Sequence, residues 1–231
     1  KYAILRDWCD RDPFDKIVMP KKTKAKSKHP ANNFYSLSEL KTFLECAKKY
    51  KEKYYVYFMT VGNLGCRPGE ALALKWKNID FKNKEIFIQH SISTDENGNK
   101  IYGPTKTPAS VRKVPLSDQL AIVLKEYKEE TIYKKGNDFI FHKDNGDFYE
   151  RSAPDHWITT LYNNYPLRRI TPHGFRHTLA TLLNNGKNNA NIKDIQYLLG
   201  HKKASTTMDT YSHFTKENEE HVAESINKLD I

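Results

Sequence analysis

Six residues in this chain are of types that could attack a phosphodiester. They lie in short sequence motifs, here called words, that are rich in glycine and hydroxyl residues. They are Arg67, Lys106, His173, Arg176, His201 and Tyr211. The planar guanidinium of arginine holds phosphate oxygens bidentately and keeps its charge. Histidine transfers protons near neutral pH, and a tyrosine becomes a nucleophile where cations and a base favour its ionised form. The set predicts metal-independent cleavage of a phosphate ester.

Arg67 and Arg176 are the predicted phosphate clamp. Arg67 stands in a glycine-rich turn before a helix, where free N–H groups also favour an anion. Glu70 follows one turn later and is interpreted as a structural partner that orients Arg67. A surface turn with an incidental arginine is the simpler alternative.

The word HGFRHT begins at His173. On a helix over 172–185, His173, Arg176 and His177 would share one face, because residues three and four apart are neighbours. His177 is assigned a supporting role, although histidines that cap or pack are common. Gly174 costs about 1 kcal/mol relative to alanine inside a helix. We therefore expect it to permit a close approach, which we assign to DNA.

The last word runs from Leu198 to His213. Gly200 is the predicted C-terminal glycine of a helix, and His201 follows it. Hydroxyl groups of Ser205, Thr206 and Thr207 precede Tyr211 and suit phosphate binding, with Ser205 and Thr207 assigned supporting roles.

These words resemble the tyrosine recombinases, or phage integrases, whose signature reads G-x-R-x-G-E, a lysine in a hairpin, H-x-x-R-H, then L-G-H and Y-x-H. The matching words here are GCRPGE at 65–70, PTKTPAS at 104–110, HGFRHT at 173–178 and LLGHKKASTTMDTYSH at 198–213. The resemblance extends from about Phe34 to His213 in the family's order. It implies the catalytic domain of an integrase from a phage or a conjugative-transposon-like element.

The resemblance also implies roles. Among 14 tyrosines, Tyr211 is selected by its place two residues before His213. It would form a 3′-phosphotyrosine, with Lys106 as the general acid for the leaving 5′ oxygen. Lys113 and Arg112 are rivals of Lys106 for that duty. No cofactor or metal is implied, and the expected partners are DNA attachment sites, a tetramer on DNA and accessory DNA-bending or excision proteins.

Composition supports a polyanionic partner. The formal net charge is +10 and the pI is about 9.3, so nucleic acid leads and an anionic membrane surface comes second. Three cysteines without a short C-x-x-C spacing fit a reducing compartment. No apolar run is long enough to span a membrane, so we expect a cytoplasmic, nucleoid-associated protein. The first residue is not Met, and we expect the chain to be part of a longer protein.

The stretch 20–30 contains five lysines and no apolar residue larger than alanine, so it should be a solvated linker. It is either a solubilising tether or a basic segment that lies along DNA phosphates. We therefore expect residues 1–33 to be the end of a core-binding domain plus the linker, and 34–231 to be the catalytic domain with a C-terminal helix. The predicted DNA-binding lysines are Lys21, Lys22, Lys24, Lys26, Lys28, Lys202 and Lys203.

The periodicity predicts a mainly α fold with a small antiparallel β-sheet (α+β). Helices are expected from Ser36, over 54–64, from Pro68 to about Lys75, over 117–133, 152–165, 172–185 and 192–199, around Tyr211, and over 216–229. Strands are expected within 79–93 and over 111–116, with a hairpin near Lys106. The last helix would serve assembly, or fold back on its own domain.

Three other functions are consistent with these residues. A type IB topoisomerase-like enzyme would nick and close DNA without joining two partners. A DNA-binding protein with an inactive relic of the site would need only the basic charge. A metal-dependent nuclease would use the histidines for a metal.

Overall fold

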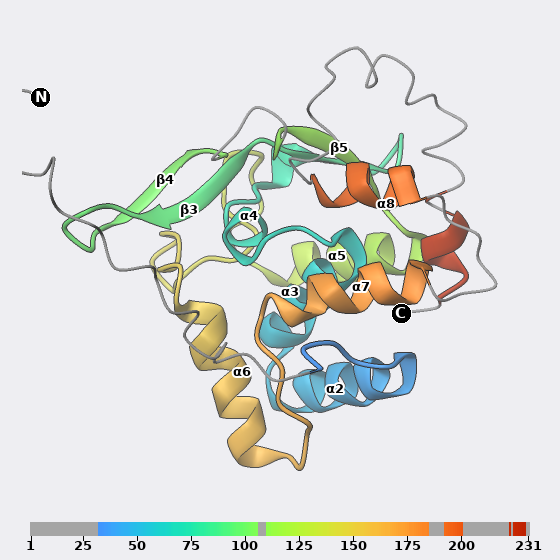
Figure 1. Ribbon diagram of the computed structural model, residues 1–231. Coiled ribbons are helices and arrows are strands. Elements are labelled where there is room, and N and C mark those ends of the chain that lie inside the picture. The colour runs from blue at the N-terminus through green and yellow to red at the C-terminus, as the bar shows by residue number, and fades with distance from the viewer. Residues whose placement is uncertain (1–31, 106–109, 185–191, 201–221, 223, 230–231) are drawn as a thin grey trace, which may run out of the picture.

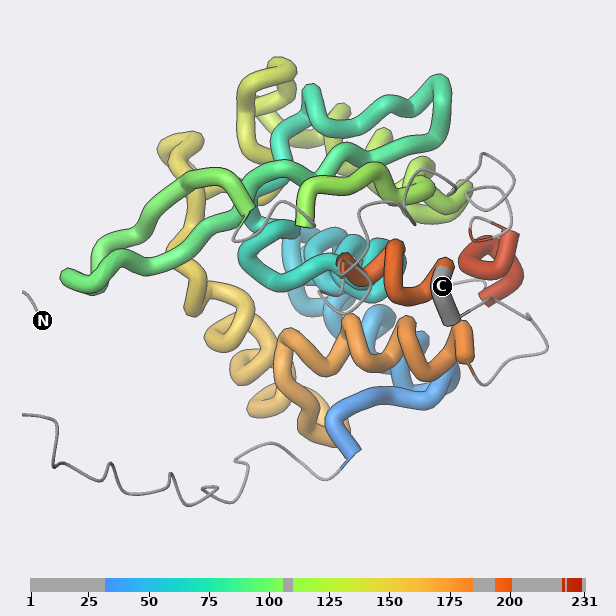
Figure 2. Tube along the Cα trace, turned by 45° about the horizontal axis from the view of Figure 1, so that its top comes forward, coloured from blue at the N-terminus to red at the C-terminus, as the bar shows by residue number. Residues whose placement is uncertain are grey.

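The computed structural model describes residues 32–105, 110–184, 192–200, 222 and 224–229 (Figure 1). Helices dominate, with short antiparallel strands beside them, which confirms the predicted fold class. Figures 1 and 2 show the strands gathered on one side of the helices, with a long hairpin that reaches out from the body. No helix in the described part of the chain is long and apolar enough to cross a membrane.

Helix α2 (Leu37–Tyr50) begins at the predicted residue. Ser36 and Glu39 form a capping box, in which the Ser36 hydroxyl accepts from the Glu39 amide and the Glu39 carboxylate accepts from the Ser36 amide. The helix buries Leu40, Phe43, Leu44 and Ala47. This is the apolar face that the spacing predicted.

Helix α3 (Glu52–Leu64) lies at the centre of the core. It is buried from Val56 to Leu64 and packs against α2, α5 and α7. The rings of Phe43 and Phe58 each lie 4.9 Å from that of Phe175 on α7. The helix ends at Gly65, whose φ of 56° is the left-handed conformation that glycine adopts without strain.

Helix α4 (Pro68–Leu72) is shorter than predicted, because the chain turns into an extended pairing. Lys75 forms a β-bridge with Phe139, and the Ile140 amide donates to the Leu74 carbonyl at 3.0 Å. The predicted end at Lys75 is therefore wrong. A short 3₁₀ helix, η1 (Trp76–Asn78), follows.

The strands form two sheets rather than the single sheet expected. One has the order β1-β2-β5, and the other pairs β3 with β4. Their bounds are Ile79–Asp80, Glu85–Ile88, His90–Thr94, Lys100–Pro104 and Arg112–Pro115 for β1 to β5. The tight turn of the β3–β4 hairpin lies at 95–99, where Asp95 accepts from the Asn97 and Asn99 amides. Lys106, predicted near a hairpin, lies outside the described residues.

The remaining helices are α5 (Asp118–Glu130), α6 (Ala153–Asn164), α7 (Gly174–Asn184) and α8 (Ile192–Leu199). Helix α7 packs against α3 and α8. In the described part of the last helical segment, Val222, Ile226 and Leu229 are buried in the chain's own core. The Asn227 side chain also accepts from the Asp118 amide at 3.0 Å. These residues thus fold back on their own domain.

Candidate active site

Arg67 and Glu70 form the ion pair expected from their spacing. Arg67 is the N-cap of α4, and its Nη1 lies 2.7 Å from Glu70 Oε1. Glu70 Oε2 accepts from the Arg67 amide at 3.0 Å. Glu70 is buried, whereas 41% of the Arg67 side chain is exposed. The carboxylate therefore fixes a guanidinium that still faces outward.

Arg112 is the second partner of Glu70. Its Nη2 lies 3.1 Å from Glu70 Oε2, and its Nε donates to the Leu198 carbonyl at 2.8 Å. The residue is buried, and it ties β5 to the end of α8. The hypothesis that Arg112 rivals Lys106 as a proton donor does not fit a guanidinium so engaged. Lys113, the other rival, is exposed and pairs with Glu85 at 2.8 Å.

The charge of Glu70 is set by its surroundings. Burial would raise the pKa of its carboxyl, but the Arg112 charge and the hydrogen bonds from Arg67 outweigh burial and hold that pKa below its ordinary value. Glu70 is therefore ionised at neutral pH and cannot serve there as an acid.

Arg176 reaches the same place from α7. Its Nη1 donates to the Gly65 carbonyl at 2.8 Å, and the residue is 2% exposed. Burial, together with the like charges of Arg112 and Arg67, lowers the pKa of Arg176 to about 10. Three guanidinium groups thus interact around one carboxylate, and a bound anion would relieve their mutual repulsion.

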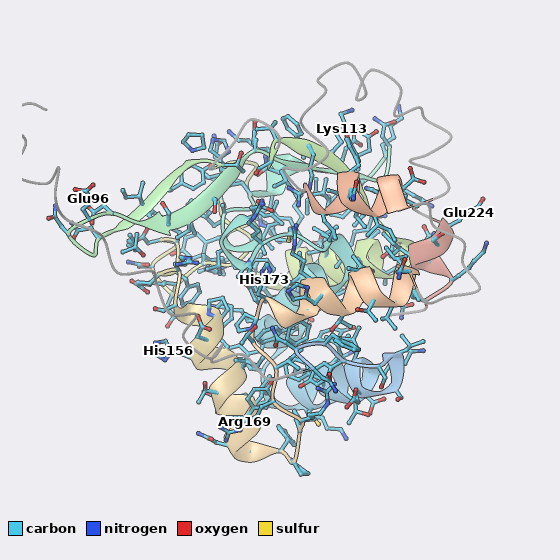
Figure 3. The ribbon with its side chains drawn as sticks, in the orientation of Figure 1. Glu96, Lys113, His156, Arg169, His173 and Glu224 are labelled. Atoms are coloured by element: carbon cyan, nitrogen blue, oxygen red, sulfur yellow. The ribbon has the colours of Figure 1, made fainter. Side chains whose placement is uncertain are left out.

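His173 does not lie on a helical face, which corrects the predicted start of this helix. Helix α7 begins at Gly174, and His173 stands just before it (Figure 3). The His173 and His177 rings lie 4.9 Å apart at nearly right angles, and both residues are exposed. Arg176 between them is buried, so the three side chains do not share one exposed face.

Gly174 approaches the chain itself, not an empty surface for DNA as expected. A Cβ at Gly174 would lie 2.8 Å from Asn33 Oδ1 and 2.9 Å from the Asn33 carbonyl oxygen. The need for glycine here comes from residue 33.

Gly65 at the end of α3 and Gly200 at the end of α8 border the arginine cluster. Gly200 has a φ of 64° and ends α8, as predicted, and its carbonyl accepts from Arg67 Nη2 at 3.4 Å. A Cβ at Gly65 would lie 2.6 Å from Leu199 Cδ2. Beside Gly65, the Cys66 thiol is buried, and burial followed by the Glu70 charge raises its pKa to about 12.

The other predicted site residues lie outside the described residues. They are Lys106, His201, Ser205, Thr207, Tyr211, Lys21, Lys22, Lys24, Lys26, Lys28, Lys202 and Lys203. Within the described segments, no group of three His, Cys, Asp or Glu residues is placed to hold a metal ion.

The sequence predicted neither the structural role of Arg112 in the cluster nor the presence of Ser110 there. The Ser110 hydroxyl accepts from Arg67 Nη1 at 3.2 Å. Both residues are buried and polar in a connection that reads as ordinary loop and strand. An arginine as buried as Arg112 is almost always paired, but its partner cannot be inferred from sequence spacing.

Sequence comparison places these residues among known proteins. The profile described as "Phage integrase family" matches residues 33–218. A "Tyrosine recombinase XerC-like" protein of Caldanaerobacter subterraneus subsp. tengcongensis is 30% identical over the whole chain. The "ICEBs1 integrase" of Bacillus subtilis is 30% identical over 98% of it. The chain spans 63% and 61% of these two relatives, respectively.

Comparison with solved structures supports the fold. An integrase of the Tn1549 transposon, solved with transposon right end DNA, has a TM-score of 0.67 at 22% identity, over 96% of this chain and 74% of that one. The XerA recombinase has a TM-score of 0.58 at 22% identity, over 89% of this chain and 66% of that one.

Proposed function

Because the chain belongs to the phage integrase family, we propose that it is a site-specific DNA recombinase that integrates or excises a mobile element. Relatives are named "Tyrosine recombinase XerC-like", "ICEBs1 integrase" and "Transposase from transposon Tn916". Their names support both the reaction class and the kind of element.

One observation carries the proposal: Arg67 and Arg176 meet at a cluster whose cationic charge exceeds that of its carboxylate partner. Glu70 and the Gly65 carbonyl hold the two guanidinium groups before any substrate is bound. Donors that are already oriented stabilise charge developing on a phosphate without a cost of reorganisation.

The proposed reaction is a transesterification. The Tyr211 phenol oxygen attacks the phosphorus and forms the 3′-phosphotyrosine bond, while the bond to the 5′ oxygen breaks. His173 and His201 serve proton transfer and phosphate contacts, and Lys106 protonates the leaving 5′ oxygen. The 5′ hydroxyl of a partner strand then attacks the phosphotyrosine and restores a phosphodiester. Bond energy is conserved, so no nucleoside triphosphate is consumed.

The proposed partners follow from this reaction. Exchange between two duplexes uses four copies of the chain on two DNA attachment sites, with accessory DNA-bending or excision proteins to choose direction. Residues 1–33 belong to a preceding domain and its lysine-rich linker, which lies along DNA, and residues 34–231 form the catalytic domain. The reaction takes place in the cytoplasm, where bacterial DNA resides.

A trapping experiment tests the proposal. The chain is incubated with a library of nicked duplexes, from which the released strand diffuses away, and DNA that survives detergent is sequenced. We expect covalent adducts from the native chain and from Tyr50→Phe, which alters an exposed tyrosine on α2, but none from Tyr211→Phe. Adducts from Tyr211→Phe would refute the nucleophile, and DNA binding without any adduct would indicate an inactive binder. Plasmid relaxation without strand exchange would instead indicate a nicking-closing enzyme.

A further inference from the structure

Residues 32–35, here called the strap, are bound along the segment that leads into α7 (Figure 2). Arg168 Nη1 donates to the Asn32 carbonyl at 2.8 Å, and Arg168 Nη2 donates to the Phe34 carbonyl. The Tyr35 amide donates to the Thr178 hydroxyl at 2.9 Å. Backbone groups on both sides of residue 33 are therefore fixed, and its side chain has little freedom to leave.

The Asn33 side chain holds the first residue of the turn that contains His173. Its Oδ1 accepts from the Thr171 amide at 2.8 Å, and its Nδ2 donates to the Thr171 hydroxyl at 2.9 Å. The Gly174 amide donates to the Thr171 carbonyl at 2.7 Å, which closes a four-residue turn. His173 is the third residue of this turn, so fixing Thr171 fixes the backbone from which the imidazole projects.

The other end of the turn is fixed by packing against the same asparagine. The missing Cβ of Gly174 would lie within 3 Å of both the side chain and the carbonyl of Asn33. The Gly174 carbonyl accepts from the Thr178 hydroxyl at 2.9 Å, and that hydroxyl in turn receives the Tyr35 amide. The strap thus grips the turn at both ends.

Resting on the proposed function, we propose that Asn33 is a positioning residue for strand cleavage. It holds the turn 171–174 so that His173 faces the phosphate gripped by Arg176, three residues further on. A catalytic group displaced by about 1 Å can cost roughly a hundredfold in rate. The hydrogen bonds of the Asn33 side chain described above go to Thr171 and not to Arg67, Arg112 or Arg176, and Asn33 acts through His173.

The first test compares variants of the full chain in single-turnover cleavage of a nicked duplex. We expect Asn33→Ala to lower the cleavage rate constant at least tenfold and to leave the DNA dissociation constant within twofold. Asn33→Asp keeps an acceptor for the Thr171 amide and should recover most of the rate. The matched control is Asn164→Ala, which removes an exposed asparagine whose Nδ2 donates to Thr160 at the end of α6.

A double-mutant cycle separates positioning from general stability. In a His173→Ala background, Asn33→Ala should cause little further loss of rate, because the group it positions is gone. An equal loss in both backgrounds would overturn the proposal. If Asn33→Ala does not fold, Thr171→Val replaces it, since that change removes only the hydroxyl partner of Asn33.

A readout without DNA keeps this inference distinct from the proposed function. The imidazole resonances of His173 are followed by NMR in the DNA-free chain. They should shift in Asn33→Ala and stay in place in Asn164→Ala. Unchanged resonances would refute the positioning role even if no variant cleaves DNA, whereas shifted resonances without cleavage would refute only the recombinase.

Discussion

Glu70 shows how much of the candidate site depends on one carboxylate that holds two guanidinium groups. One buried carboxylate accepts hydrogen bonds from the side chains of Arg67 and Arg112. Removing one partner of a buried ion pair typically costs about 3–5 kcal/mol, because the remaining charge is left without compensation. The orientation of Arg67 and the stability of the domain are therefore linked through Glu70.

The stability of the chain should depend on pH through this carboxyl. The pKa of Glu70 in the folded protein lies below the ordinary value of 4.5. Its contribution is therefore fully present above pH 4.5 and is lost as the pH falls through the folded pKa. Glu70→Gln should lower the free energy of unfolding by about 3 kcal/mol at pH 7, and the deficit should shrink as the pH falls below 4.5. Urea unfolding at several pH values measures it.

Glu45→Gln on the exposed side of α2 is the matched control. It should change the free energy of unfolding by less than about 0.5 kcal/mol at any pH in this range. A deficit for Glu70→Gln that stayed constant from pH 7 to pH 3 would contradict the ion-pair account.

Sequence reasoning at this scale succeeded where partners are neighbours in the chain. Arg67 and Glu70 are three residues apart beside a helix start, so their pairing could be predicted. The bonds from Arg112 to Glu70 and Leu198 connect residues 42 and 86 positions apart. Such contacts depend on how distant segments come together in the folded chain, which no local pattern encodes.

At the scale of elements, helix boundaries followed local chemistry where it was complete. The capping box at Ser36 marks the start of α2, and the left-handed glycines end α3 and α8. Helix α4 ended early because Lys75, its last predicted residue, pairs with the distant Phe139. Tertiary pairing overrides helix propensity there.

At the scale of elements, Gly174 at the start of α7 allows a prediction for which Gly62 on α3 is the control. Glycine to alanine inside a helix usually stabilises by up to about 1 kcal/mol. Gly62→Ala on α3 should follow this rule, since the nearest atom to its new Cβ is 4.0 Å away. Gly174→Ala should instead lower the melting temperature, because its Cβ would meet Asn33. Calorimetry of the two variants measures the difference, and a rise in both would show that the strap yields easily.

At the scale of the whole molecule, the net charge and the order of the motifs could be used to predict family and partner, whereas the arrangement of the strands could not be predicted. The ordered words predicted the family, and the +10 charge predicted a polyanion as partner. The separation into two sheets and the outward hairpin were not predicted, because strand pairing is set by contacts between distant segments.

The lysine-rich stretch makes a prediction for DNA binding by the whole chain. Replacing Lys21, Lys22, Lys24, Lys26 and Lys28 by glutamine should weaken binding and reduce the slope of log K against log salt. Each phosphate neutralised contributes about 0.9 to that slope, so the reduction should approach about 4.5 if all five lysines contact DNA. Fluorescence anisotropy over a range of KCl concentrations gives both values.

Lys48, Lys49 and Lys51, exposed around the end of α2, are the control set. Their replacement by glutamine should leave the slope within about one of the native value. An equal loss per lysine in the two sets would mean that the stretch 20–30 is only a tether.

The rate at which the buried thiol of Cys66 is alkylated would measure how often the arginine cluster opens. A thiol with a pKa of about 12 and no exposed surface reacts with alkylating reagents only when its surroundings open. The labelling rate of Cys66 in a Cys9→Ser chain, with the partly exposed Cys46 as internal reference, therefore reports how often the turn between α3 and α4 comes apart. Binding of DNA to the cluster should slow that rate and leave the labelling of Cys46 unchanged, so a mass spectrum can time the opening of the site without any turnover.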